Sequence, residues 1–298
     1  MTLLELLKTT AELFRTVHPG GSKSCAIVNH VCYEGFPVTV CPDVHGRPEL
    51  VKKALAAPGP VVFVGDIIHR EDNEIWKRML VEQKGPLHER PEFQAEVEAN
   101  LTCWKLILEA KEKDPDRIHF VRGNHDDTEG VLMGGYSKGF FSSEAWKEGL
   151  YDLNSVFCKR MIEFERSIPY VYCGFYTENK VSSDIIVTHS FPHTPSWTKT
   201  PKLNHPETHD TYSWSDNTSY NSNWDQHPTH VLDELMAGQF ASDWSSLDHW
   251  FVGHRPVTEG LARVQGFGKV VQINNQKQHV LLTYDPAEQG QKWQANLV

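Results

Sequence analysis

The sequence predicts an α/β fold built as a layered sandwich, and three features predict it. Short apolar runs recur along the chain, and each stops at a polar residue, as is typical of strands that are buried on both faces. Segments with helical periodicity lie between these runs. The chain has 298 residues, 39% of them hydrophobic, which is enough core for one large α/β domain or two ordinary ones.

The N-terminal segment MTLLELLKTTAELFRTV predicts an amphipathic helix that begins with a capping box of Thr2 and Glu5. The segment lacks the basic start and the small-residue cleavage site of a signal peptide. No stretch of the sequence is as long and apolar as a membrane span. We therefore expect a soluble cytoplasmic protein without a membrane partner.

The following elements alternate between strands and helices. We expect strands in residues 25–32 and 36–41, and then in the segments PGPVVFVGD, IHFVRGNHD, SDIIVTHS and LDHWFVGHR. One helix is expected to begin near Pro91 and a second after Ser142 or Ser143, because apolar residues recur there at helical spacing. The segment IPYVYCGFY, the turn TENK and the strand SDIIVTHS predict a hairpin.

The segment 190–244 differs from the rest because it is rich in Pro, His, Thr, Ser, Asn and Trp. Loops of this length in a compact domain are usually functional or disordered, and we expect a long loop on the substrate side. Its aromatic residues either stack on a nucleobase or pin the loop to the body of the protein. These aromatic residues are Trp197, Trp214, Tyr220 and Trp224.

Composition narrows the classes of function. The formal net charge of −10 argues against a broad electrostatic surface for nucleic acid or anionic membrane. The six cysteines show no C-x-x-C spacing, so neither a zinc cage nor a disulfide framework is indicated, and we expect most of them to be small buried residues. Sixteen histidines in an acidic chain favour a metal site.

Five expected strands end on residue types that bind metals. One such residue is weak evidence, since D-x-H and G-N-H-D also occur as turns and a lone buried histidine is often part of the core. Together they predict one site, because the loops after the strands of an open α/β sheet converge. The residues are Asp43 and His45 in CPDVHG, Asp66 in VGD, Asn124 and His125 in RGNHD, His189 in VTHS and His254 in VGHR.

These motifs, in this order over residues 38–260, resemble those of the calcineurin-like metallophosphoesterases. The resemblance implies a single domain over residues 1–298, a four-layer α/β/β/α sandwich and two divalent ions, which we expect to be manganese, with iron or zinc as alternatives. It assigns one ion to Asp43, His45 and Asp66. It assigns the second ion to Asp66, as the bridging ligand, with Asn124, His189 and His254.

The resemblance also implies the roles of the catalytic residues. In the family, two metals activate a water for in-line attack on phosphorus, and His125 is the expected proton donor to the leaving oxygen. Arg70, in GDIIHR, is expected to bind the substrate phosphate. His69 stands where protein phosphatases have the aspartate that orients this histidine, so Asp126 is the candidate substitute.

The sequence leaves the roles of two further arginines open. Arg122 either binds phosphate or forms a structural ion pair. The family's second phosphate-binding arginine has no counterpart between Ser167 and His254, which leaves Arg255 or a lysine such as Lys199 as candidates.

Longer segments suggest the branch of the family. The hairpin segment, the motif YSWSD and the ending HRPVTEG resemble the serine/threonine protein phosphatases. The motif G-N-H-D, the residue at position 69 and GHRPV also resemble diadenosine tetraphosphatases. The 58 residues from Asp66 to Asn124 leave room for a helical insertion across residues 71–115.

We therefore expect a phosphoric monoester hydrolase that acts on phosphopeptides or small phosphoesters. The first alternative is a hydrolase of nucleotides or dinucleoside polyphosphates. A non-catalytic metal-binding interaction module is the second.

Overall fold

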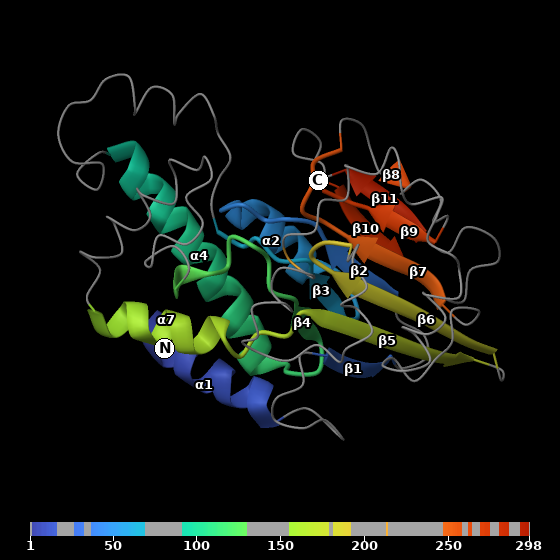
Figure 1. Ribbon diagram of the computed structural model, residues 1–298, viewed down its shortest axis with the longest axis horizontal. Coiled ribbons are helices and arrows are strands. Elements are labelled where there is room, and N and C mark those ends of the chain that lie inside the picture. The colour runs from blue at the N-terminus through green and yellow to red at the C-terminus, as the bar shows by residue number, and fades with distance from the viewer. Residues whose placement is uncertain are drawn as a thin grey trace.

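The computed structural model describes residues 2–16, 27–32, 37–68, 91–129, 155–178, 181–191, 213, 247–257, 262–263, 269–274, 280–285 and 293–297. In this part of the chain four helices lie beside two β-sheets (Figure 1). The helices are α1 (Leu3–Thr16), α2 (Pro48–Ala56), α4 (Pro91–Lys113) and α7 (Ser155–Glu165).

The first helix begins at the capping box that the sequence predicts. The Glu5 backbone N–H donates to Thr2 Oγ1 at 3.3 Å, and the Thr2 backbone N–H donates to Glu5 Oε2 at 2.8 Å. These bonds satisfy amide groups that have no partner within the helix.

The five-stranded sheet has the order β11-β10-β2-β3-β4. Strands β2 (Val38–Cys41), β3 (Val61–Phe63) and β4 (Ile118–Phe120) are parallel to one another, while β10 (Val280–Tyr284) and β11 (Trp293–Leu297) complete the sheet with antiparallel pairs. Parallel neighbours require a crossover, and α2 and α4 provide it. The carboxyl ends of β2, β3 and β4 therefore lie at the same edge.

The six-stranded sheet has the order β1-β5-β6-β7-β9-β8. Its hairpin consists of β5 (Val171–Glu178) and β6 (Val181–Thr188), and β7 (Leu247–Val252) runs parallel to β6. Strands β1 (Ile27–Cys32), β9 (Val270–Gln272) and β8 (Ala262–Arg263) complete it. The carboxyl ends of β6 and β7 are therefore neighbours.

Two cores hold the layers together. Between the sheets, Val40 and Val62 of one sheet belong to the same cluster as Ile185 and Phe251 of the other. A second core joins the helices to the outer face of the five-stranded sheet, and it contains Trp104 of α4. Figure 1 shows the resulting sequence of helical layer, five-stranded sheet and six-stranded sheet.

The predicted α/β sandwich is confirmed in its two sheets and in the helical layer beside the five-stranded sheet. All four described helices contribute to this one core, so the second helical layer of the predicted four-layer sandwich is not found among the described residues. Within the expected helical insertion, residues 91–113 form α4, whose Trp104, Ile107 and Leu108 are fully buried core residues. Helix α4 is thus an integral part of the domain, while residues 71–90 are not described.

Most predicted elements have counterparts in the structure. The helix near Pro91, the hairpin and the five strands with polar ends are confirmed. Of the segment expected to form a helix after Ser142 or Ser143, residues 155–165 form α7, and the expected start at residue 142 or 143 lies outside the described residues. Strands β8 to β11, which all lie after residue 260, were not predicted from the sequence. Among described helices, none is long and apolar enough to cross a membrane.

Candidate metal centre

The loops after five strands bring the six predicted metal ligands together. Asp43 and His45 follow β2, Asp66 follows β3, and Asn124 follows β4, so they come from the five-stranded sheet. His189 follows β6 and His254 follows β7, so they come from the six-stranded sheet. The site therefore lies where the carboxyl ends of strands from both sheets meet.

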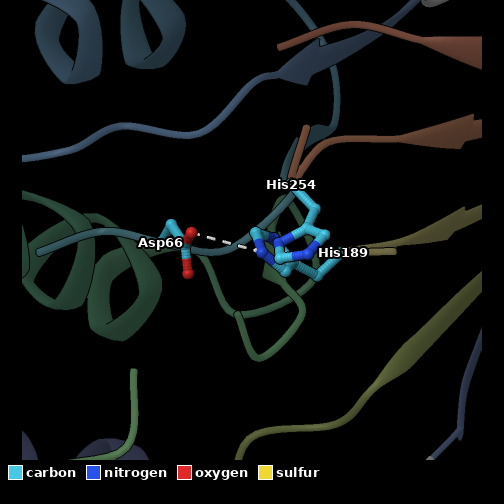
Figure 2. Close-up of side chains that lie close together, drawn as sticks. All are labelled: Asp66, His189 and His254. Carbon is cyan, nitrogen blue, oxygen red and sulfur yellow. Dashed lines mark ion pairs between the residues drawn. The ribbon is translucent and has the colours of Figure 1, made fainter. Parts of the chain in front are cut away.

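The Asn124 side chain, which follows a strand of the five-stranded sheet, contacts both histidines that follow strands of the six-stranded sheet. Its Oδ1 lies 2.8 Å from His189 Nε2 and 2.9 Å from His254 Nδ1. His189 Nε2 is also 3.2 Å from Asp66 Oδ2. Figure 2 shows the Asp66 carboxylate facing the His189 ring, with the His254 ring beside it.

The ligand atoms fall into two groups that share Asp66. One contains Asp43, His45 and Asp66, and the other contains Asp66, His189 and His254, with the ligand atoms of each group within 4.8 Å of one another. Carboxylate, imidazole and amide oxygen donors together suit manganese, iron or zinc. The residues present therefore fit divalent metal, and the two candidate ligand groups have Asp66 in common.

The backbone at this site has an unusual conformation. Among the described residues, the non-glycine residues with positive φ are His45 at 47°, Asp66 at 47° and His254 at 65°. Left-handed backbone is unfavourable for residues with a Cβ, and such residues cluster at functional sites. All three are predicted ligands.

Three glycines allow the loops to approach closely. A Cβ added to Gly65 would lie 2.6 Å from the Gly123 nitrogen, and one added to Gly123 would lie 2.2 Å from Asp66 Oδ1. A Cβ on Gly253 would lie 1.9 Å from Asp43 Oδ1. Real Cβ atoms do not approach other atoms so closely, so the packing of the site requires glycine at these positions.

Burial and neighbouring charges shift the pKa values of Asp66 and of the two histidines grouped with it. Burial would raise the pKa of Asp66, but His189, His125 and His45 hold it well below its usual value. Burial would likewise lower the pKa of His189, yet Asp66 and Asp43 raise it to about 9. The pKa of His254 is well below its usual value because the ring is buried and lies beside His189.

The predicted proton donor lies at the edge of the site. His125 Nε2 is 3.9 Å from Asp66 Oδ2, and the His125 side chain is 13% exposed. The His125 backbone N–H donates to Asp66 Oδ1 at 2.8 Å, which fixes the backbone of this residue against the shared ligand. Its ring also meets the His45 ring edge-on, with centroids 5.7 Å apart.

Asp126 supports the backbone of the site. Its Oδ1 accepts the Ile67 N–H at 3.0 Å, and its Oδ2 accepts the Gly123 N–H at 3.1 Å. These hydrogen bonds join the loop that carries Asp66 to the loop that carries Asn124. Burial and the nearby Asp66 raise the pKa of Asp126 to about 7. The role of carboxylate partner for His125 stays a prediction.

Arg122 forms a structural ion pair, one of the two roles that the sequence left open. It is buried, and its Nη2 lies 2.7 Å from Asp127 Oδ1. Its Nη1 donates to the Tyr170 hydroxyl, and its Nε donates to the Asp126 carbonyl. These three contacts hold the guanidinium group of Arg122 in the protein interior, as expected for a structural role.

The predicted phosphate ligands are only partly described. Arg255 is half-buried next to His254, and its charge adds to the burial and the His189 charge that lower the pKa of His254. Arg70, His69 and Lys199 lie outside the described residues. So do Trp197, Trp214, Tyr220 and Trp224. Within residues 190–244 the described residues are Ser190, Phe191 and Ser213.

Sequence reasoning missed two residues that contact a predicted ligand. Asn274 donates to the Asp43 carboxylate, and Gly253 leaves room for that carboxylate. The glycine before the histidine in VGHR was a visible signal, since glycine also precedes Asp66 and Asn124. For Asn274 no sequence motif gave a signal.

Comparisons with known proteins agree with this geometry. Residues 36–280 match the sequence model of the calcineurin-like phosphoesterases. The fold is similar to that of a protein serine/threonine phosphatase from Saccharomyces cerevisiae with similarity to human phosphatase PP5. That likeness has a TM-score of 0.58 and 14% sequence identity, and it covers 99% of this chain and 88% of that chain. No curated protein sequence is significantly similar to this chain.

Proposed function

Because the chain belongs to the calcineurin-like phosphoesterase family and is a hydrolase of phosphoester bonds, we propose that it is a metal-dependent phosphoric monoester hydrolase. The observation that carries the proposal is the pair of ligand groups that share Asp66. A single carboxylate between two sets of imidazole and carboxylate donors is the arrangement that a binuclear centre needs.

The side chains have separable roles in this proposal. Two divalent ions bound there would lower the pKa of a water and hold the phosphoryl oxygens. The six ligands would hold both ions, and five of these six residues are buried, which limits the access of bulk water to the site. His125, which is partly exposed beside Asp66, donates a proton to the leaving oxygen. Arg70 and Arg255 are the proposed phosphate ligands.

The substrate class and the metal are part of the proposal. The motifs shared with serine/threonine protein phosphatases, together with the likeness in fold, support phosphopeptides or small phosphoesters as substrates. The oxygen and imidazole donors support manganese, with iron or zinc as alternatives. We propose the cytoplasm as the compartment, which the free thiols Cys41 and Cys103 support.

The test is hydrolysis of p-nitrophenyl phosphate by manganese-loaded protein. We expect turnover by the wild type and a fall to the background rate in Asp66→Asn, because this change weakens the ligand that both groups share. Asp114→Asn is the matched control, since Asp114 is exposed at the end of α4 and should leave the rate unchanged.

A substrate panel separates the alternatives. Much faster turnover of diadenosine tetraphosphate than of phosphopeptides would show that the protein is a dinucleoside polyphosphate hydrolase rather than a phosphoric monoester hydrolase. A metal-replete protein that is inert on mono-, di- and dinucleotide phosphoesters would contradict catalysis and favour a binding module.

A further inference from the structure

A buried amide contacts the ligand site from the segment after a strand that supplies no ligand. Asn274 follows the end of β9 and is 2% exposed. Its Nδ2 donates to Asp43 Oδ2 at 2.6 Å and to the His254 carbonyl oxygen at 3.2 Å. Both partners are acceptors, so the side chain must present its NH2 group to them, and both hydrogens are used.

The two partners of Asn274 belong to different halves of the site. Asp43 follows a strand of the five-stranded sheet and belongs to the group with His45 and Asp66. His254 follows a strand of the six-stranded sheet and belongs to the group with Asp66 and His189. One amide group therefore links both ligand groups and both sheets, independently of the shared Asp66.

The backbone around Asn274 strengthens this link. The Ile273 N–H donates to the Val252 carbonyl at 2.8 Å, and the Val257 N–H donates to the Asn274 carbonyl at 2.7 Å. These bonds hold the loop after β7 on both sides of His254. His254 has a φ of 65°, a conformation that persists only when its surroundings impose it.

Asp43 also needs orientation, because a carboxylate can rotate about its terminal torsion. Its Oδ2 accepts two donors, the Asn274 amide at 2.6 Å and the His254 backbone N–H at 2.9 Å. Hydrogen bonds of this kind hold a metal-ligating carboxylate in its binding orientation, and their loss typically lowers metal affinity by about 10–100-fold.

We infer that Asn274 is a positioning residue that sets the affinity of both metal positions by orienting Asp43 and holding His254. The inference rests on the proposed function insofar as that function requires two bound ions. It assigns no contact with substrate to Asn274.

The experiment measures manganese binding to metal-free protein by titration calorimetry. Asn274→Leu keeps a similar volume and removes both donors, and Asn274→Ala is the second variant in case Leu is not accommodated. We expect manganese affinity to fall by about 10–100-fold in either variant. We also expect kcat at a fixed, subsaturating manganese concentration to fall more than KM changes.

Gln272→Leu is the matched control. Gln272 is a buried amide two residues before Asn274, and its Nε2 donates to the Arg255 carbonyl rather than to a ligand residue. We expect its manganese affinity to stay within about threefold of the wild type. A merely structural role for Asn274 would lower the melting temperature in EDTA without a selective loss of affinity.

The outcomes are distinct. Wild-type affinity in a folded Asn274 variant would overturn the inference and leave the proposed function intact. Failure of both variants to fold in EDTA would make Asn274 a folding determinant and also overturn it. A wild-type protein that binds no manganese, iron or zinc would contradict the proposed function, and this inference with it.

Discussion

The strained residues of the site show what an individual side chain contributes. His45, Asp66 and His254 each adopt left-handed backbone, which costs roughly 1–2 kcal/mol for a residue with a Cβ. Hydrogen bonds offset part of this cost: the His45 N–H donates to the Asp66 carbonyl, and the His254 N–H donates to the Asp43 carboxylate. The loops and their hydrogen bonds thus fix the backbone of these three predicted ligands.

Close packing around Asp43 leads to a prediction at the same scale. In Gly253→Ala the new Cβ would lie 1.9 Å from Asp43 Oδ1 and 3.0 Å from Val64 Cγ1, so Asp43 must move. We expect at least about a tenfold loss of manganese affinity, measured by calorimetry. Unchanged affinity in a folded Gly253→Ala protein would show that Asp43 keeps its place by other means.

At the scale of elements, helix α7 supports the loop after β4. Glu165, the last residue of α7, accepts the Thr128 backbone N–H at 2.7 Å and the Thr128 hydroxyl at 2.7 Å. Together with the Asp126 and Arg122 contacts, these bonds fix the loop that carries Asn124 and His125. A satisfied buried network of this kind favours one conformation of the loop.

Glu165 also predicts a pH dependence of stability. Burial raises its pKa from 4.5 to about 8, although Arg122 and Thr128 favour the ionised form. Its contribution to stability is complete below pH 4.5 and is lost as the pH rises to about 8, because the unfolded chain then releases a proton that the folded chain keeps. The expected slope from this group is at most about 1.4 kcal/mol per pH unit.

Urea unfolding in EDTA between pH 5 and pH 8 measures this slope. In Glu165→Gln we expect the free energy of unfolding to vary less with pH than in the wild type. Glu163→Gln, an exposed neighbour on α7, should keep the wild-type slope. Equal slopes in Glu165→Gln and the wild type would show that Glu165 is ionised in the folded protein.

Sequence and structure differ most where contacts join distant parts of the chain. The strand ends and their ligands could be predicted because an apolar run and the polar residue after it are adjacent in sequence. The partners of Asp126 and Asn274 could not be predicted, since each hydrogen bond depends on how separate loops pack. Arg122 stayed ambiguous for the same reason: its partner Asp127 is near in sequence, but Tyr170 is 48 residues away.

The strands after residue 260 were not predicted for a different reason. Strands β8 and β9 have two and three residues, too few to show a period, and β11 is largely exposed. Their place in the sheets comes from pairing with other strands, such as β11 with β10 and β9 with β7. Tertiary context of this kind is not visible in a sequence window.

For the whole molecule, ligands from both sheets couple metal binding to stability. Any ion that binds the folded chain but not the unfolded one raises the free energy of unfolding, by about 2.7 kcal/mol at a concentration 100 times its Kd. We therefore expect EDTA to lower the melting temperature of metal-loaded wild type. Asp66→Asn should show a much smaller shift, because Asp66 belongs to both ligand groups. Equal shifts in the two proteins would place the stabilising ion elsewhere.

The long separation between partners at the site has a consequence for biosynthesis. The Asp43 carboxylate accepts hydrogen bonds from the backbone N–H of His254, 211 residues later in the sequence, and from the side chain of Asn274, 231 residues later. A nascent chain acquires its N-terminal strands first. Those strands are synthesised well before β7 and β9, so the complete centre cannot assemble until β9 has left the ribosome.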